Sequence, residues 1–196
     1  MTPPYGYSYQ SNMRAKSAQS AVIANDDKIL AGFVPVAADI SDGWVLVCTS
    51  WKVIAEWLRA TECLGDITNL IVWDKGGGGM GDLAHSLSTD YELVLAFNRG
   101  AEIFGKRIGS VWSIGKDRAG DYQHATQKPV ALVEQAVTTF SADAALVYDP
   151  FLGSGTCLVA SHRLGRTCYG LELEPKYADV VLKRAEAEAL TCEKAG

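Results

Sequence analysis

Two glycines one residue apart, Gly153 and Gly155, form the clearest site for chemistry in the sequence. The apolar residues 144–148 before them are typical of a buried strand, and residues 157–164 after them have the spacing of a helix. A strand, a glycine turn and a helix in this order form the nucleotide-binding unit of α/β proteins. Glycine is needed because the backbone turns sharply and a ligand must approach it without an intervening Cβ.

An acidic residue in the next apolar run extends this unit. Residues 168–173 predict a second strand, and Glu172 lies nineteen positions after Gly153. That is about the separation at which a carboxylate reaches the two ribose hydroxyls of a nucleotide. The sequence therefore predicts a nucleotide-type cofactor site between the glycine turn and Glu172.

Three motifs resemble those of the amino-group DNA methyltransferases, which methylate adenine N6 or cytosine N4. Residues 149–156, Asp-Pro-Phe-Leu-Gly-Ser-Gly-Thr, resemble the S-adenosylmethionine motif of that family, and residues 124–129, His-Ala-Thr-Gln-Lys-Pro, resemble the motif before it. Residues 2–5, Thr-Pro-Pro-Tyr, resemble the catalytic Asp-Pro-Pro-Tyr motif with its first residue changed. The catalytic motif comes first and the cofactor motif last, which is the family's β-type order.

The resemblance covers nearly the whole chain and implies its architecture. It implies an α/β methyltransferase fold, with a Rossmann-like, mostly parallel sheet and helices on both faces. The 196 residues would form a single domain, as their number also suggests. Residues 97–123 would be a short target-recognition region, and residues 124–190 would be the cofactor-binding half.

The resemblance also implies roles for individual residues. In the family, an acidic or polar first residue and a proline carbonyl accept the hydrogens of the target amine, and the aromatic fourth residue stacks on the extruded base. The catalytic residues would be Thr2, Pro3, Pro4 and Tyr5. The residues that bind S-adenosylmethionine would be Thr126, Gln127, Lys128, Asp149, Phe151, Gly153, Ser154, Gly155, Thr156 and Glu172.

Two departures from the family pattern fall at the start of the chain. Thr2 replaces the acid, and its uncharged hydroxyl is a weaker hydrogen-bond acceptor than a carboxylate. Serine replaces the acid in cytosine-N4 relatives, so a hydroxyl does not disqualify the motif. The apolar strand that leads into the motif in the family is not seen, because only Met1 precedes Thr2. A truncated chain, a misplaced start or a decayed gene would each explain both departures.

The charge of the chain is unevenly distributed. The net charge of −5 argues weakly against a nucleic-acid partner, but residues 98–128 hold six basic and three acidic residues. A basic patch on an acidic body can contact phosphates locally, although a solvated loop of mixed charge is the alternative. The predicted contacts with double-stranded DNA are Arg99, Lys106, Arg107, Lys116 and Arg118.

Other features of the sequence exclude several classes of protein. No apolar run approaches the roughly 18 residues that span a bilayer, and no secretory signal opens the chain. The five cysteines form no CxxC pair, and the three histidines are scattered, so neither a metal site nor a disulfide framework is expected. We therefore expect a cytoplasmic protein without a metal or membrane partner; a homodimer is left open.

The remaining elements are predicted from hydrophobic spacing. A helix should run through Ile29, Phe33 and Val36, with Pro35 complicating it, and residues 44–49 suit a buried parallel strand. Further helices are predicted over 52–63, from 128–129 onward and from 174–175 onward, and further strands over 68–73 and 91–98.

Methylation of adenine N6 in DNA is the first functional interpretation, and Tyr5 favours it over cytosine N4, the alternative target. A non-catalytic cofactor-binding remnant, or a subunit that needs a partner chain, is the second interpretation because of Thr2 and the unseen strand. A Rossmann-type oxidoreductase is the third. Its GxGxxG pattern does not fit Asp149-Pro150 before the turn, and titration of NAD against S-adenosylhomocysteine would distinguish it.

Overall fold

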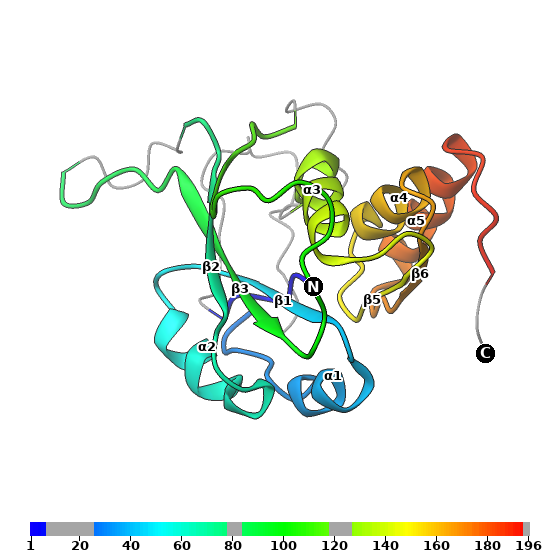
Figure 1. Ribbon diagram of the computed structural model, residues 1–196. Helices are drawn as coiled ribbons and strands as arrows, with labels where there is room; N and C mark the ends of the chain where they lie inside the picture. The colour runs from blue at the N-terminus through cyan, green and yellow to red at the C-terminus, as the bar shows by residue number, and fades with distance from the viewer. Residues whose placement is uncertain (7–25, 78–83, 118–126, 194–196) are drawn as a thin grey trace.

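The computed structural model describes residues 1–6, 26–77, 84–117 and 127–193 (Figure 1). Its elements follow in the order α1 (Val34–Ile40), β1 (Trp44–Thr49), α2 (Ile54–Ala60), the 3-10 helix η1 (Glu62–Leu64), β2 (Asn69–Asp74), β3 (Tyr91–Asn98), β4 (Val111–Ser113), α3 (Val130–Phe140), β5 (Leu146–Asp149), α4 (Thr156–Arg163), β6 (Thr167–Gly170) and α5 (Pro175–Ala187). The α/β class predicted from the sequence is confirmed. No helix of the described ranges is long and apolar enough to cross a membrane.

The strands form two sheets. The larger sheet has the order β1-β3-β2-β4, in which β3 runs antiparallel to both of its neighbours and β2 runs parallel to β4. The smaller sheet consists of β5 and β6, which are parallel. The prediction of a parallel strand over residues 44–49 was wrong about direction, since β1 pairs antiparallel with β3 along its whole length.

Helices cover both faces of the larger sheet, as Figure 1 shows. Successive side chains of a strand point to opposite faces, so the apolar residues of β1 serve two cores. Val45 and Val47 pack with Val34 and Trp57 of α1 and α2, whereas Leu46 faces the other side, towards α3. A strand whose apolar residues alternate between the two faces of the sheet therefore contacts both layers of helices.

The smaller sheet belongs to the strand–turn–helix unit predicted around the glycines. Strand β5 ends at Asp149, α4 begins at Thr156, and β6 returns parallel to β5, which is the crossover arrangement expected of such a unit. Helices α3, α4 and α5 lie together beside this sheet (Figure 1). The observed boundaries lie within three residues of the predicted ones.

Two local features differ from the sequence-based expectations. Pro35 lies in the first turn of α1 and helps to begin the helix at Val34, because the missing N–H of proline has no helical partner in that turn. Strand β4 was not predicted: it is three residues long and only Trp112 of it is buried, so it carries almost no hydrophobic pattern.

The first residue of the chain lies against the outer edge of β1. The Met1 nitrogen donates to the Leu46 carbonyl oxygen (3.1 Å), and the Cys48 N–H donates to the Met1 carbonyl oxygen (3.1 Å). This is the hydrogen-bond pattern of parallel strands. The segment that begins at Met1 therefore leaves the sheet in the direction of β1.

Candidate active site

The glycine turn has the backbone that its sequence predicts. Gly153 and Gly155 have φ angles of +55° and +82°, a region that side-chain-bearing residues rarely adopt. A Cβ at Gly155 would also lie 3.2 Å from Cγ2 of Val181 in α5, whereas a Cβ at Gly153 would meet only the Phe151 oxygen, at 4.0 Å. Gly155 is therefore fixed by packing, and the space beside Gly153 is open for a ligand to approach the backbone.

Glu172 lies directly against this turn. Its Oε2 accepts a hydrogen bond from the Gly153 N–H (2.7 Å), and its Oε1 accepts one from the Glu174 N–H (2.8 Å). The carboxylate thus shapes the loop, and it lies beside the glycine turn, where the spacing predicts a contact with a ribose. Since a carboxylate offers about four lone-pair sites, two remain for a ligand.

A residue that the sequence analysis did not identify holds the other side of the turn. The Nη1 atom of Arg184, in α5, donates to the Ser154 carbonyl oxygen (2.8 Å), to Ser154 Oγ (3.2 Å) and to Thr156 Oγ1 (3.3 Å). Ser154 Oγ donates in turn to Gln127 Oε1 (3.0 Å), and Gln127 Nε2 donates to Asp117 Oδ2 (3.2 Å). Three of the predicted cofactor residues therefore belong to one polar network.

Two further predicted cofactor residues lie at the start of the turn. Asp149 is buried, and its Oδ1 accepts from the Phe151 N–H (3.1 Å). The Phe151 ring packs edge-on against Phe33, which precedes α1, with the ring centroids 4.9 Å apart. Aromatic pairs prefer this geometry, and it ties the turn to the layer beneath the larger sheet.

The Thr-Pro-Pro-Tyr segment is close to the start of the glycine turn. Burial is the largest influence on the Met1 ammonium and lowers its pKa, but the charge of Asp149 and the smaller effects of Cys48, Cys157 and Cys168 together outweigh it, so the pKa is raised overall. Such an interaction requires Asp149 to be near Met1. Pro3 is fully buried, whereas Thr2, Pro4 and Tyr5 are only partly covered.

Gly6 fixes the end of this segment. Its φ angle is +82°, and a Cβ there would lie 2.5 Å from the backbone of Lys28 and Ile29. Its N–H donates to Oδ1 of the buried Asp26 (2.8 Å). The four residues from Thr2 to Tyr5 are thus anchored at both ends, by β1 and by Gly6.

A cluster of charged and aromatic side chains surrounds Tyr5. The Tyr5 hydroxyl donates to Glu92 Oε2 (2.5 Å), the same oxygen that lies 2.8 Å from Lys128 Nζ. Lys75 Nζ lies 3.5 Å from Glu92 Oε1. The Lys128 ammonium also lies 5.0 Å from the ring centroid of Tyr5 and 5.7 Å from that of Trp73, within cation–π range.

The charges in this cluster shift two pKa values. Burial alone would raise the pKa of Glu92, but the charge of Lys128 and hydrogen bonds from Lys128 and Tyr5 lower it to about 2. Burial lowers the pKa of Lys75; Glu92 opposes this effect, and the charge of Lys116 adds to it. Lys128 was predicted to contact the cofactor, and its ammonium, which is 7% exposed, is paired with Glu92.

The predicted DNA contacts do not form one set. Arg99 donates from Nη2 to the Ala38 carbonyl oxygen (3.1 Å) and from Nη1 to that of Leu64 (3.5 Å). It follows the opposite end of β3 from Glu92, roughly 20 Å away at the rise of a strand. The guanidinium therefore has a structural role at the ends of α1 and η1.

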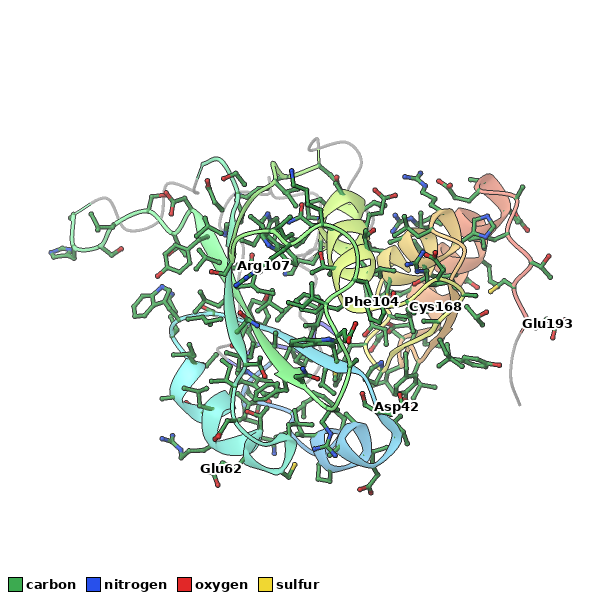
Figure 2. All side chains as sticks on the ribbon, in the orientation of Figure 1. Asp42, Glu62, Phe104, Arg107, Cys168 and Glu193 are labelled. Carbon is green, nitrogen blue, oxygen red and sulfur yellow. The ribbon has the colours of Figure 1, made fainter. Side chains whose placement is uncertain are left out.

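Lys106, Arg107 and Lys116 are exposed, as a DNA contact would require. Arg107, labelled in Figure 2, lies on the loop before β4. This loop is held at α3 by the Phe104 N–H, which donates to the Thr139 carbonyl oxygen (2.9 Å). Arg118 and Thr126, the remaining predicted contacts, lie outside the described residues.

Glu92, Arg184, Gly6 and Phe33 are the site residues that sequence reasoning did not assign. Each has a partner at least twenty positions away in the chain, and none stands in a pattern that points to that partner. The described residues contain no group of three or more side chains that could hold a metal ion.

Comparison of the sequence with known proteins identifies relatives of part of the chain. Residues 101–183 match the family model described as DNA methylase. The chain is 35% identical over 99 residues to the Type II methyltransferase M2.DpnII of Streptococcus pneumoniae, and 39% identical over 87 residues to M.HinfI of Haemophilus influenzae. These matches cover 50% and 40% of this chain, but only 36% and 24% of the relatives. The chain thus spans about a third or less of these relatives.

Solved structures share the fold over most of the chain. The M1.HpyAVI–SAM complex matches with a TM-score of 0.68 and 23% identity, over 79% of this chain and 80% of that one. The cytosine-N4-specific PvuII DNA methyltransferase matches with a TM-score of 0.61 and 15% identity, over 73% of this chain and 64% of that one. The fold is therefore the methyltransferase fold, and residues 101–183 are similar in sequence to DNA methylases.

Proposed function

We propose that this chain transfers a methyl group from S-adenosylmethionine to adenine N6 in double-stranded DNA, in the cytoplasm, with cytosine N4 as the alternative target. The observation that carries the proposal is the position of Thr2 to Tyr5. Met1, directly before them, is hydrogen-bonded to β1 and is electrostatically coupled to Asp149, the first residue of the glycine turn. A methyl donor held by the turn and a base held by this segment would therefore be neighbours.

The turn has features that fit S-adenosylmethionine. The open space at Gly153, the remaining acceptor sites of Glu172 and the aromatic ring of Phe151 suit a nucleoside with a charged tail. When bound, this cofactor supplies an electrophilic methyl group on a sulfonium sulfur. We assign Asp149, Ser154, Gly155, Thr156 and Gln127 to the shape of the turn, which their hydrogen bonds and packing support.

The segment from Thr2 to Tyr5 would hold the target amine. An exocyclic amine is a poor nucleophile, because its lone pair is delocalised into the base. Hydrogen bonds from its two N–H groups to Thr2 Oγ1 and to the Pro3 carbonyl oxygen would orient the amine and localise the lone pair. Tyr5 would stack on the base after extrusion from the duplex, and Pro4 would keep the segment extended.

Substitution of Thr2 tests the proposal. A positioned acceptor in such a site is typically worth about 10²–10³ in rate, so we expect normal cofactor binding but slow methyl transfer in the native chain. Thr2→Asp should raise the rate at least about tenfold, and Thr2→Val should abolish what remains. The measurements are transfer of labelled methyl to unmodified duplex DNA and calorimetry with S-adenosylhomocysteine. Full activity with Thr2 would instead favour cytosine N4.

A cofactor-binding subunit without its own catalysis is the second candidate. The uncharged Thr2 at the position of the family's acid favours it. If Thr2→Asp binds S-adenosylhomocysteine but transfers no methyl group, this second function is supported and the first is refuted. Failure to bind S-adenosylhomocysteine at all would refute both.

A further inference from the structure

Glu92 is the acceptor at the centre of the cluster around Tyr5. It lies in β3 directly opposite Trp73 of β2, so the two side chains lie next to each other on the sheet. Its carboxylate accepts a hydrogen bond from the hydroxyl of Tyr5, a residue 87 positions earlier in the chain. We propose that Glu92 is a positioning residue that fixes the Tyr5 ring to receive the target base, a role that rests on the proposed function.

The geometry gives the Tyr5 ring two points of attachment. The hydroxyl is held 2.5 Å from Glu92 Oε2, and the Lys128 ammonium lies 5.0 Å from the ring centroid. Because Lys128 is itself held 2.8 Å from the same carboxylate oxygen, Glu92 controls both attachments. Loss of the carboxylate would therefore remove the acceptor of the Tyr5 hydroxyl and the anionic partner of Lys128.

The two neighbouring lysines keep the Glu92 acceptor charged at neutral pH. The two lysines, Lys128 and Lys75, keep Glu92 ionised far below neutral pH, as its pKa of about 2 records. An ionised acceptor makes a stronger hydrogen bond to a tyrosine hydroxyl than a neutral one. Glu92 is 21% exposed at its side chain, so water competes only partly for these bonds.

Such a role differs from simple stabilisation of the fold. The substrate of an amino-methyltransferase must be oriented closely, since small displacements of a reacting group cost large factors in rate. Phosphate contacts supply most of the affinity for DNA and do not involve Tyr5. Loosening the Tyr5 ring should therefore lower kcat and leave the KM for DNA almost unchanged.

The test uses the full chain with Tyr5→Phe, Glu92→Ala, Glu92→Gln and the double variant Tyr5→Phe/Glu92→Ala. Tyr5→Phe and Glu92→Ala should each lower kcat about tenfold, the effect expected for loss of a hydrogen bond to a charged group. Glu92→Gln should retain part of the rate, because its amide oxygen can still accept from Tyr5. The double variant should be no slower than Glu92→Ala, because both substitutions break the same bond. Glu56→Gln, on the exposed face of α2, is the matched control.

A second readout does not depend on methyl transfer. Carbon-13 labelling of the tyrosine rings gives a signal for Tyr5 that is assigned by its loss in Tyr5→Phe. This signal should shift in Glu92→Ala and Glu92→Gln and stay unchanged in Glu56→Gln. Calorimetry with S-adenosylhomocysteine should show unchanged cofactor affinity in every variant.

Three results would overturn the proposal. These are an unmoved Tyr5 signal in Glu92→Ala, additive effects on kcat in the double variant, and a loss of cofactor affinity that accounts for the lower rate. If neither the Thr2 nor the Thr2→Asp background transfers methyl groups, the proposed function has failed and the role of Glu92 in transfer fails with it. A Tyr5 signal that still responds to Glu92→Ala would then identify the contact as purely structural.

Discussion

Two glutamates at the site show how the hydrogen-bond partners of a carboxylate determine its role. Glu172 accepts hydrogen bonds from two backbone N–H groups next to the glycine turn, whereas the partners of Glu92 in the described part of the chain are the side chains of Tyr5, Lys128 and Lys75. A carboxylate that holds backbone shapes a loop, and one held between two lysines organises the side chains around it. Both can therefore affect activity without acting as an acid or a base.

Replacement of Glu172 should weaken cofactor binding. Glu172→Ala removes charge-assisted acceptors and should cost roughly 2–3 kcal/mol in the binding of S-adenosylhomocysteine, measured by calorimetry. Glu174→Gln, two residues further along and partly exposed, is the control. A 2′-deoxyribose analogue separates the two roles of Glu172: a ribose contact requires the parent to prefer the ribose compound and Glu172→Ala to lose that preference. Equal affinities of parent and variant would show that Glu172 contacts no ligand.

Glu92 should make the protein sensitive to acid. Its pKa in the folded chain, about 2, lies below its ordinary value of 4.5, so the stabilisation is complete above pH 4.5 and is lost as the pH falls towards 2. A shift of this size corresponds to at most about 3 kcal/mol. In Glu92→Gln the free energy of unfolding should therefore fall less steeply over this window, as measured by urea denaturation. Glu56→Gln should keep the parent's slope; an equally steep slope in Glu92→Gln would refute the pairing.

The sequence predicted the residues of the glycine turn better than the residues that hold the turn and Tyr5 in place. Gly153, Gly155 and Asp149 follow from local rules, because a tight turn between a strand and a helix needs those residue types. Arg184 and Glu92 act on residues 30 and 87 positions away, respectively, and a single sequence contains no rule for such separations. Arg99 was predicted to contact DNA on its charge alone, and the sequence did not indicate that its guanidinium donates to two backbone carbonyl oxygens.

At the scale of elements, the unit from β5 to α5 depends on one close approach between helices. Gly155 begins α4 beside Val181 of α5, which is buried. Gly165, after α4, has a similar φ of +70°, but a Cβ there would meet nothing within 4 Å. The two glycines thus share a backbone requirement and differ in packing.

This pair allows a matched test of the packing. Gly155→Ala and Gly165→Ala should both lose about 1 kcal/mol of stability from the unfavourable φ, and Gly155→Ala should lose about 1–3 kcal/mol more from overpacking. Thermal unfolding measures both. Val181→Ala should restore part of the loss in Gly155→Ala and none in Gly165→Ala. Equal losses of stability in the two single variants would show that α5 moves to accept the added methyl group without loss of stability.

The predictability of the elements follows the strength of their patterns. Strand β1 was predicted with its observed bounds, because five successive apolar residues and a β-branched threonine follow a turn residue. Its direction could not be predicted, since an apolar run looks the same whether its neighbours are parallel or antiparallel. Strand β4 has one buried residue, and its pairing with β2 supplies the order that its sequence lacks.

At the scale of the whole molecule, the charge is divided between an acidic body and a basic segment. Lys106, Arg107 and Lys116 are exposed cations of that segment, and Lys116 is close enough to Lys75 to lower its pKa. At least one of these cations therefore lies near the cluster that holds Tyr5. DNA bound there would bring a base within reach of the Thr2–Tyr5 segment.

Removal of these three cations should weaken DNA binding and its dependence on salt. In the triple variant Lys106→Ala/Arg107→Ala/Lys116→Ala, the slope of log K against log[salt] should fall by roughly 0.9 for each DNA phosphate that the protein no longer neutralises. The charge-matched control replaces Arg59, Lys176 and Lys183, on α2 and α5, with alanine. If the two triple variants have the same salt slope, DNA is bound on another surface.

The hydrogen bonds from Arg184 to the glycine turn have a consequence for folding during translation. Chains are synthesised from the N-terminus, and structure forms as segments emerge. Ser154 and Thr156 emerge well before the arginine that holds them, 30 and 28 positions later. The sheet of β1 to β4 can form on the nascent chain before the glycine turn has its hydrogen bonds from Arg184. The glycine turn therefore reaches its final form only after α5 has left the ribosome.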